Sequence, residues 1–519
     1  MTASAHDAQK VEAEAMQQEL RSQMARGAAW MVLFKLLDRG IGFLSTLVLA
    51  RLLTPSNFGI VAMATSFIAM LELIGAFGFD MALIQRSNTT RAHYDTAWTF
   101  SVILGCTLSV LMLALSVPIA RFYGQPALVY VICALAGGSL LQGFQNVGTV
   151  AFRKDMEFHK EFRFLLSKRL ATVPVTITLA FVLQNYWALV AGMVLGRAVD
   201  LLLSYRFHPY RPRLDLSAAQ DLLHFSKWLL LLNALQFLRD RSSDFVIGRI
   251  AGASALGIFS VSYELANMPS TELVAPINRA VYPAYVKIAG DIPALQREYL
   301  SVMSMICLLA IPAVAGVAAT ASLIVPLALG QNWLGAIPVL QVLAFFGMSQ
   351  VMQSNAYAVC LALGRGNVFS MLNGAFVAIL ITLMIVLVET RGLAGAAYAY
   401  LSTAVIMMPI AVAVILRILK LPTRRFIGAI WRPLSASTLM FLIVDRYSSL
   451  TPSTSSVSEL VSAMVIAIAS GVVLYVGSVS LLWWLSGKPD SAEATIANKI
   501  WLRYRSAIGF IRSRFNRIG

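Results

Sequence analysis

The chain has 519 residues, of which 58% are hydrophobic and only 13% are charged, whereas about 25% are charged in an average soluble domain. This composition excludes a string of soluble domains, and the apolar residues suffice for about fourteen membrane spans of about 20 residues each. The net charge of +16 does not indicate a nucleic-acid partner, because the basic residues follow the alternation of the predicted loops. We therefore predict an all-α polytopic membrane protein with about fourteen transmembrane helices.

Polar breaks between apolar runs define the predicted elements in chain order. A polar N-terminal segment, 1–27, precedes the first span and is expected to be cytoplasmic. The predicted spans are 28–50, 58–83, 96–119, 127–150, 164–183, 186–205, 225–248, 257–283, 299–328, 336–362, 368–388, 393–416, 426–445 and 459–486.

The distribution of basic residues predicts the orientation. Of the 41 Lys and Arg residues, 31 lie in the terminal segments and in the loops and span edges on the N-terminal side, five lie on the opposite side and five lie inside spans. Short cytoplasmic loops carry such an excess of Lys and Arg. The sequence therefore predicts a multi-pass protein of the bacterial inner membrane with both termini in the cytoplasm.

The C-terminal tail, 488–519, is basic and amphipathic. Its apolar residues from Trp501 to Ile518 recur every three to four positions, and most of its cations lie off that stripe. The pattern favours a helix on the anionic inner leaflet, so membrane lipids are expected partners; a cytoplasmic helix packed on neighbouring loops is the alternative.

An internal repeat divides the predicted spans. The segment 50–60 (ARLLTPSNFGI) is similar to 248–258 (GRIAGASALGI), and an offset of 198 residues also aligns Trp30 with Trp228. The repeat predicts two six-helix lobes in parallel orientation, with a substrate site between them near mid-membrane. The predicted parts are the segment 1–27, an N-lobe (28–223, spans one to six), a C-lobe (224–420, spans seven to twelve), spans thirteen and fourteen (421–487) and the tail 488–519.

Ionisable residues inside the spans are the candidate site residues, because a charge at the centre of a membrane helix costs roughly 2.5–3.5 kcal/mol and needs a partner or a function. Cations that could hold an anionic head group such as a pyrophosphate are Lys35, Arg39, Arg239, Arg241 and Arg197. Carboxylates that could pair with these cations or carry a coupling proton or sodium ion are Asp38, Asp240, Asp244 and Glu72.

Interhelical ion pairs that only fix packing are the alternative interpretation of these charges. It is strongest for Arg197 and Asp200, i,i+3 neighbours that are expected nearer the cytoplasm. It is weaker for spans one and seven, where four cations outnumber three carboxylates and do not recur at repeat-equivalent positions: Lys35 aligns with Asn233, and Arg39 aligns with Phe237.

Signatures of enzymes and metal sites are missing from the sequence. GxSxG, P-loop, HExxH and Cys-x-x-Cys patterns are absent, and the four cysteines each lie inside an apolar run, typical of small buried hydrophobes. No catalytic residue, metal or other cofactor is expected beyond a coupling ion.

Several short segments resemble the Wzx-type polysaccharide flippases, in particular their colanic-acid-exporter-like branch. They are ARLLTPSNFGIVAMAT and GFDMALIQR within 47–86, FRKDMEFHKEF (152–162), NYWALVAG (185–192), ALGIFSVSYEL (255–265), NRAVYPAY (278–285), GQNWLGAIPVLQVLA (330–344) and LALGRGN (361–367). The resemblance covers roughly 25–420 and implies membership of the multidrug/oligosaccharidyl-lipid/polysaccharide exporter superfamily.

The resemblance also implies a function. Such proteins translocate an undecaprenyl-pyrophosphate-linked oligosaccharide across the inner membrane for exopolysaccharide or lipopolysaccharide synthesis, and a polysaccharide polymerase and a chain-length regulator are the expected protein partners. Alternatives are a small-molecule efflux transporter of the same superfamily and a membrane polysaccharide polymerase. The cationic spans disfavour the first alternative, and the short outer loops disfavour the second.

Overall fold

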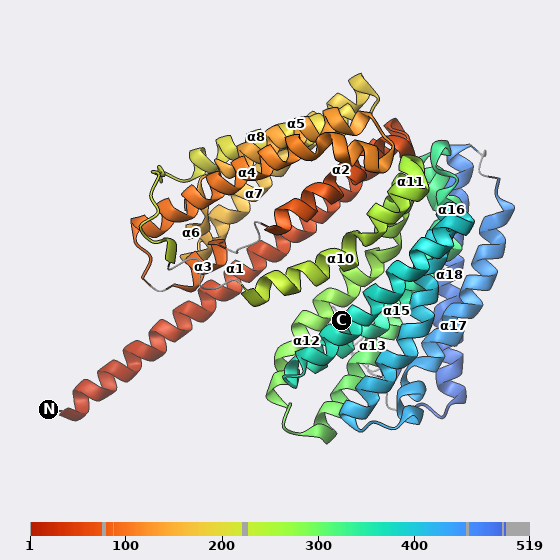
Figure 1. Ribbon diagram of the computed structural model, residues 1–519. Helices are drawn as coiled ribbons and strands as arrows, with labels where there is room; N and C mark the ends of the chain where they lie inside the picture. The colour runs from red at the N-terminus through yellow and green to blue at the C-terminus, as the bar shows by residue number, and fades with distance from the viewer. Residues whose placement is uncertain are drawn as a thin grey trace, which may run out of the picture. The chain divides into compact units, whose positions relative to one another are not determined.

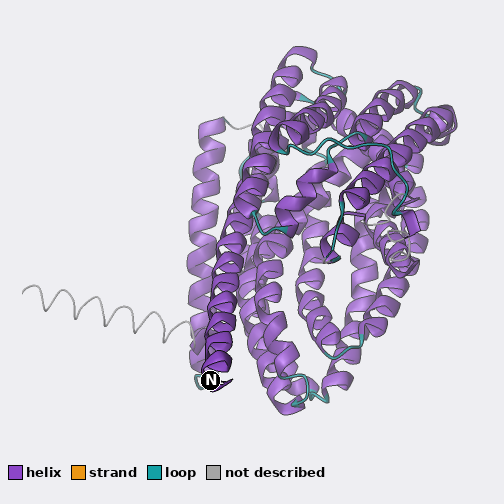
Figure 2. Cartoon of the chain, turned by 90° about the vertical axis from the view of Figure 1, so that its left-hand side faces the viewer, coloured by secondary structure: helices purple, strands orange, loops and turns teal. Residues whose placement is uncertain are grey.

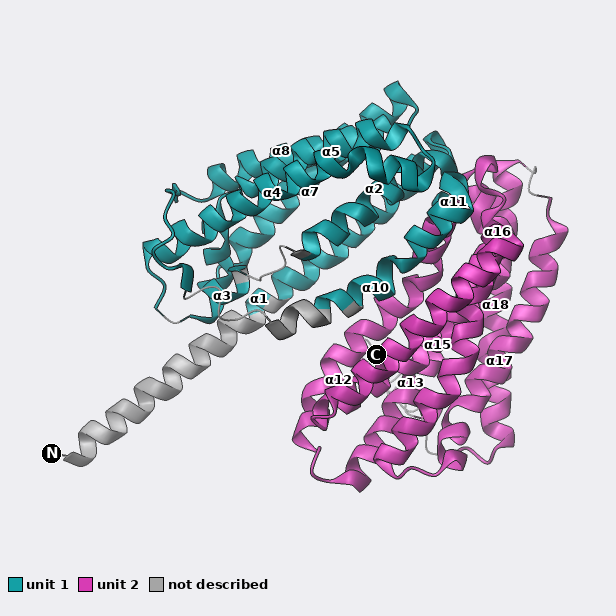
Figure 3. Ribbon diagram, viewed as in Figure 1, with its two compact units in different colours: residues 1–257 teal, residues 258–519 magenta. Residues whose placement is uncertain are grey.

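The computed structural model describes residues 2–74, 79–86, 88–220, 227–452, 456–489 and 492–494. All regular secondary structure in these segments is helical, with no strand among them (Figure 2). The chain divides into two compact units, Met1–Gly257 (unit 1) and Ile258–Gly519 (unit 2) (Figure 3). The predicted all-α fold is confirmed.

Unit 1 is a bundle built from pairs of neighbouring helices. α4 packs along α5, α7 along α8 and α5 along α8, while α1 packs against α7 and α10 against α2. The helices are α1 (Thr2–Leu52), α2 (Pro55–Ile74), α3 (Phe79–Gln85), α4 (Arg91–Tyr123), α5 (Ala127–Gly143), a 3-10 turn (Val147–Val150), α6 (Ala151–Lys154), α7 (Phe158–Leu183), α8 (Trp187–Phe207), α10 (Lys227–Ile250) and the start of α11 (Gly252–Pro269) (Figure 1).

Unit 2 is built around α13. This helix packs against α15 and α17, and α16 and α18 extend the bundle from α15 and α17. Its core includes the fully buried Tyr285, Tyr299 and Cys307. After α11 the elements are a π turn (Ser270–Val274), α12 (Ala275–Lys287), α13 (Ile292–Ala319), α14 (Ala321–Ile324), a π turn (Val325–Leu329), a 3-10 turn (Gln331–Trp333), α15 (Ala336–Ala362), α16 (Gly366–Leu419), α17 (Thr423–Leu450) and α18 (Val457–Leu485).

Several helix ends follow local chemical signals. α4 stops because Gly124 adopts the left-handed region (φ 64°) and donates its N–H to the carbonyls of Ala120 and Arg121. α18 starts with a capping box, in which the Ser456 hydroxyl accepts from the Glu459 N–H and the Glu459 carboxylate accepts from the Ser456 N–H.

The positions of the helices agree with those of the predicted spans better than the number of helices does. Among the described residues, nine helices are long and apolar enough to cross a membrane, and the bent pair Ala127–Gly143 and Val147–Lys154 makes a tenth. One of the nine, α16, holds a non-helical residue, Gly392 (φ 57°, ψ −134°), between the predicted spans 368–388 and 393–416. The multi-span architecture is therefore confirmed, and the figure of fourteen stays a prediction.

Helices α2, which is described up to Ile74, and α3, which is described from Phe79, lie within or beside the predicted span 58–83, and residues 75–78 lie outside the described residues. The predicted boundary between lobes at 223/224 also stays a prediction. Unit 1 extends beyond it to Gly257 because α10 packs along α2.

Two glycines from the repeated segments make a reciprocal contact at the starts of α2 and α11. A Cβ on Gly59 would lie 1.7 Å from the Ala253 carbonyl oxygen, and a Cβ on Gly257 would lie 1.9 Å from the Pro55 carbonyl oxygen. The offset of 198 residues that aligns Gly59 with Gly257 also aligns Pro55 with Ala253. The contact is thus symmetric in the repeat, and it has the small-xxx-small form that lets two membrane helices approach closely.

All four cysteines are free, as the sequence suggests, and Cys307 and Cys360 are buried. The predicted amphipathic tail helix lies outside the described residues, apart from the short segment 492–494.

Candidate functional site

The predicted charged stripe of span one lies on α1. The Asp38 carboxylate accepts a hydrogen bond from the Arg169 guanidinium of α7, while Lys35 is exposed and Arg39 is half-buried. Packing of Trp30 on Phe162, with ring centroids 4.8 Å apart, holds α1 on α7 near this stripe. Lys35 therefore stands on the exposed side of a helix that Asp38 anchors to its neighbour.

The predicted stripe of span seven lies on α10. Asp240 accepts a hydrogen bond from Gln236 one turn earlier (2.8 Å), and Arg239 is half-buried. Arg241 is paired with Asp244 at 3.2 Å, and the buried Asp244 also accepts a 2.5 Å hydrogen bond from Ser66 of α2. Asp244 therefore sits in the interface between α2 and α10, where a buried carboxylate needs such partners.

Arg197 and Asp200 on α8 do not pair with each other. Arg197 donates to Ser139 Oγ of α5 at 2.7 Å and lies 3.4 Å from Glu72 Oε1 of α2. Asp200 is paired with Lys168 of α7. Each side chain reaches a different neighbouring helix and ties α8 to another part of unit 1, which agrees with the interpretation of these charges as interhelical ion pairs.

A polar cavity of about 370 Å³ opens beside the contact between Arg197 and Glu72. Its wall comes from the end of α2, the middle of α4, the end of α5 and the following turn. The lining residues are Glu72, Ser101, Leu104, Gly105, Leu108, Ser139, Gln142, Gly143, Gln145, Asn146, Val147, Thr149 and Val150.

Glycines shape the floor of this cavity. A Cβ on Gly105 would lie 2.8 Å from Gly143 Cα, and a Cβ on Gly143 would lie 2.8 Å from the Ser101 carbonyl oxygen. α4 and α5 therefore approach closely at this level. Just beyond, the chain turns by 67° between α5 and Val147–Lys154, so the polar residues 142–146 end a helix rather than continue it.

Asn146 fixes the bend. Its side-chain oxygen accepts from the Gly148 N–H at 2.9 Å, and its amide nitrogen donates to the carbonyl of Tyr210 at 2.8 Å. Its own N–H donates to Ser204 Oγ at 3.0 Å. Asn146 is almost completely buried, and these contacts use its hydrogen-bonding groups within the protein. We infer a structural role for it rather than contact with a ligand.

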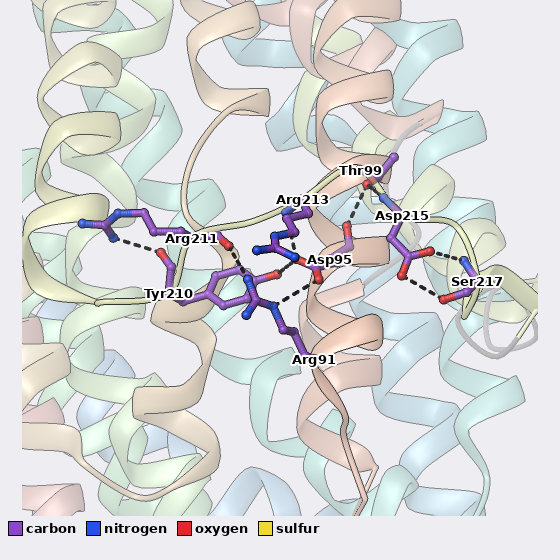
Figure 4. Close-up of polar contacts among 8 residues, drawn as sticks. All are labelled: Arg91, Asp95, Thr99, Tyr210, Arg211, Arg213, Asp215 and Ser217. Atoms are coloured by element: carbon purple, nitrogen blue, oxygen red, sulfur yellow. Dashed lines mark hydrogen bonds and ion pairs between the residues drawn. The ribbon is translucent and has the colours of Figure 1, made fainter.

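The segment after α8 is held on α4 by Asp95 (Figure 4). The buried Asp95 carboxylate accepts hydrogen bonds from the Tyr210 hydroxyl (2.5 Å) and the Arg213 N–H (2.8 Å), and it pairs with Arg91 at 3.5 Å. Burial and the hydrogen bond to Asp95 raise the pKa of Tyr210, so this phenol stays protonated and donates. One carboxylate thus fastens two points of this segment.

Threonines of α4 extend the same contact. Thr99 Oγ1 accepts from the Asp215 N–H at 3.0 Å, and Thr96 Oγ1 accepts from the Ala218 N–H at 3.3 Å (Figure 4 shows Thr99 and Asp215). Burial, followed by the charge of Lys160, lowers the pKa of His208, so its neutral ring accepts from the Tyr210 N–H. Side chains about one turn apart on α4 therefore hold residues 208–218 along the start of that helix.

Replacing Asp95 by alanine is expected to loosen this segment. The half-buried Tyr210 hydroxyl and the Arg213 N–H would lose their acceptor. A buried group left unsatisfied costs about 1–3 kcal/mol, and partial access to water lowers that cost here. Thermal unfolding in detergent should shift to lower temperature, and trypsin should cleave faster after Arg213, which Leu214 follows. Asp215→Ala is the matched control, because the Asp215 carboxylate bonds to its chain neighbours Ser217 and Leu216 and does not hold the segment on α4. Equal cleavage rates in both variants would contradict this role of Asp95.

The sequence did not identify these polar contacts. Asp95 and Asn146 are isolated polar residues near span ends, where polar residues are ordinary. The polar sequence 142–146 (QGFQN), inside the predicted span 127–150, was the one available signal of a break and a cavity. The predicted meeting of the α1 and α10 charges in one cleft stays a prediction.

Curated relatives are polysaccharide biosynthesis proteins of bacteria. The lipopolysaccharide biosynthesis protein WzxC of Escherichia coli (strain K12) is 26% identical over 432 residues, which cover 81% of this chain and 87% of that protein. The teichuronic acid biosynthesis protein TuaB of Bacillus subtilis (strain 168) is 23% identical over 461 residues, covering 88% and 95%. The chain therefore aligns with nearly the whole length of both relatives.

Solved structures show the same fold. The lipid II flippase MurJ in an inward closed conformation has a TM-score of 0.69 at 13% identity, covering 87% of this chain and 99% of that one. An inward-facing multidrug resistance transporter of the MATE family, from the MOP superfamily, has a TM-score of 0.58 at 17% identity, covering 73% and 95%. The chain therefore shares the fold of these two proteins.

The family assignment rests on the sequence. The pattern of the polysaccharide biosynthesis protein family matches residues 48–338, more than half of the chain, including α2, the cavity and the start of unit 2. This match confirms the resemblance recognised in the sequence. The chain belongs to the polysaccharide biosynthesis protein family and is a multi-span membrane protein with the MurJ/MATE fold.

Proposed function

We propose that this protein is a flippase that moves an undecaprenyl-pyrophosphate-linked oligosaccharide across the bacterial inner membrane for exopolysaccharide or lipopolysaccharide synthesis. The observation that carries the proposal is the family match, which joins polysaccharide biosynthesis to a transporter fold. The name of the MurJ neighbour, a lipid II flippase, supports a lipid-linked substrate. The relatives from E. coli and B. subtilis support a polysaccharide product.

The cations inside the predicted spans support an anionic head group. Lys35, Arg39, Arg239 and Arg241 lie on the helices that open the two predicted lobes, and Arg197 lies on α8. A pyrophosphate accepts several charge-assisted hydrogen bonds from such groups. In this proposal the fourteen spans form two six-helix lobes and two added helices. The lipid crosses the membrane by alternating access, through a site between the two lobes.

Carboxylates beside these cations would hold them when the site is empty. Asp38, Asp240, Asp244 and Glu72 fill that role in the proposal, and one of them carries a coupling proton or sodium ion.

The polysaccharide polymerase and the chain-length regulator would take over the lipid-linked unit at the outer face. The tail, 488–519, would rest on the anionic lipids of the inner leaflet.

Small-molecule efflux is the second candidate function, since the MATE transporter also shares the fold. Cationic drugs favour sites lined by carboxylates. The five cations inside the predicted spans would repel such drugs and therefore disfavour this candidate. A polymerase is less favoured still, because the fold is that of transporters.

Deletion of the gene tests the proposal. Cells lacking this chain should stop exporting polysaccharide and should accumulate a lipid-linked oligosaccharide that stays sensitive to enzymes only on the cytoplasmic face. Expression of the intact chain should reverse both effects. Normal export in the deletion strain, together with increased sensitivity to drugs, would favour efflux instead.

The orientation gives a separate prediction. Reporter fusions after residues 90, 210 and 519 should report cytoplasm, and fusions near 186 and 452 should report periplasm, because 31 of 41 basic residues lie on the side of the termini. Alkaline phosphatase and green fluorescent protein are suitable reporters. A periplasmic signal at 519 would overturn the predicted even number of spans.

A further inference from the structure

The cavity in unit 1 contains hydrogen-bonding groups that the protein does not use. Gln142 is exposed and Gln145 is half-buried, and both line the cavity. Their side-chain amides have no hydrogen-bond partner among the residues that the structure describes. A primary amide offers two donors and two acceptor sites. Two such amides, about one turn apart at the end of α5, allow the cavity wall both to donate and to accept hydrogen bonds.

The charge of the cavity wall is balanced. Within the described part of the chain its one charged lining residue is Glu72, and Arg197 lies 3.4 Å from that carboxylate while also donating to Ser139. A carboxylate whose charge is balanced by an arginine has little net attraction for either a free anion or a free cation. The wall therefore favours a neutral ligand with many hydroxyl groups.

The hydroxyls nearest the amides leave room for such a ligand. Ser101 and Thr149 donate to carbonyls of their own helix or turn, at 3.0 Å and 3.1 Å, so their oxygens can still accept. Gly105 and Gly143 add backbone without side chains to the floor. The volume of about 370 Å³ falls in the range of small-molecule sites, about 300–1,000 Å³.

We propose that this cavity binds a sugar unit of the transported oligosaccharide, apart from the cations of α1 and α10 that would hold the pyrophosphate. The inference rests on the proposed function and assigns a different part of the same substrate to unit 1. Each sugar hydroxyl is both a donor and an acceptor, which matches the two unused amides. Glu72, held by Arg197, supplies a fixed acceptor beside them.

Binding measurements with two lipids test this site. The full-length protein, purified in detergent, is titrated with undecaprenyl pyrophosphate, which carries no sugar, and with the lipid-linked oligosaccharide isolated from cells that lack this chain. The wild-type protein should bind the oligosaccharide lipid more tightly. The double variant Gln142→Leu/Gln145→Leu should bind that lipid about ten-fold or more weakly than the wild type and should bind undecaprenyl pyrophosphate unchanged.

Controls separate loss of the site from loss of the fold. Gln85→Leu removes an exposed amide that does not line the cavity and should bind both lipids like the wild type. The single variant Gln142→Leu changes an exposed side chain and should give a smaller loss, confined to the oligosaccharide lipid. The comparison of the two lipids on the wild-type protein depends on no variant.

Two results would overturn the inference alone, and a third would overturn the proposed function with it. Equal affinity of the wild-type protein for both lipids would show that no sugar site contributes, while the flippase function would stand. Unchanged binding of the oligosaccharide lipid by the double variant would exclude these amides. Failure of the folded wild-type protein to bind either lipid would instead overturn the proposed function together with the inference.

Discussion

Replacing Lys35 by glutamine is expected to abolish polysaccharide export while the amount of folded protein in the membrane stays unchanged. Lys35 is exposed on α1, and the packing of α1 depends on Asp38 and Trp30 instead. Loss of one charge-assisted contact with a pyrophosphate, worth about 1.5–3 kcal/mol, corresponds to roughly ten- to hundred-fold weaker binding. Export is measured in the deletion strain, and protein level by immunoblot of membranes.

Two further variants show whether charge at this position is the cause. Lys35→Arg keeps the charge and should retain most of the export. Lys287→Gln removes an exposed cation at the end of α12 and should leave export normal. Normal export with Lys35→Gln at normal abundance would remove Lys35 from the head-group site.

Arg241→Gln should behave differently from Lys35→Gln. Arg241 is the ion-pair partner of the buried Asp244, so its loss would leave that carboxylate with hydrogen bonds from Ser66 and Ser243 but without its balancing cation on α10. We expect both export and folded amount to fall, and Asp244→Asn in the same chain should restore the amount. Restored amount without restored export would place Arg241 in both packing and transport.

Adding a methyl group at Gly59 is expected to destabilise the protein strongly. In Gly59→Ala the new Cβ would lie 1.7 Å from the Ala253 carbonyl oxygen, a backbone atom that cannot turn aside. Overpacking of this kind costs typically about 1–3 kcal/mol and occasionally more. Gly257→Ala should have the same effect, because its Cβ would meet the Pro55 carbonyl oxygen at 1.9 Å.

Thermal unfolding in detergent measures this effect, with Gly374→Ala as the control. Gly374 lies within α16, and no atom lies within 4 Å of its Cβ position, so alanine there should leave the unfolding temperature unchanged or raise it slightly. Wild-type unfolding temperatures for both Gly59→Ala and Gly257→Ala would contradict the reciprocal contact.

Much of the architecture could be predicted because hydropathy is local. The apolar runs placed the helices of both units, and a break between the predicted spans 368–388 and 393–416 is found at Gly392. The offset of 198 residues found in the sequence brings Gly59 and Gly257 into contact. Such features are encoded in neighbouring residues or in a repeat that sequence comparison can detect.

The pairing of charges could not be predicted, because it depends on which helices are neighbours. The sequence shows Arg197 and Asp200 as i,i+3 neighbours but cannot name their partners on other helices; the packing of α8 against α5 and α7 brings Ser139 and Lys168 within reach. The bend after Gly143 likewise depends on Asn146 meeting the segment after α8, more than 50 residues away in the chain.

Transfer of a lipid-linked oligosaccharide between leaflets by the purified protein tests the central claim most directly. The full-length chain is reconstituted in vesicles that carry the oligosaccharide lipid from the deletion strain, and exposure of the sugar is followed with a glycosidase that cannot cross the membrane. We predict that the lipid of the inner leaflet becomes sensitive to the enzyme with the wild-type protein and stays protected with the Lys35→Gln variant. Continued protection of the inner-leaflet lipid in vesicles that contain the folded wild-type protein would contradict the proposed flippase function.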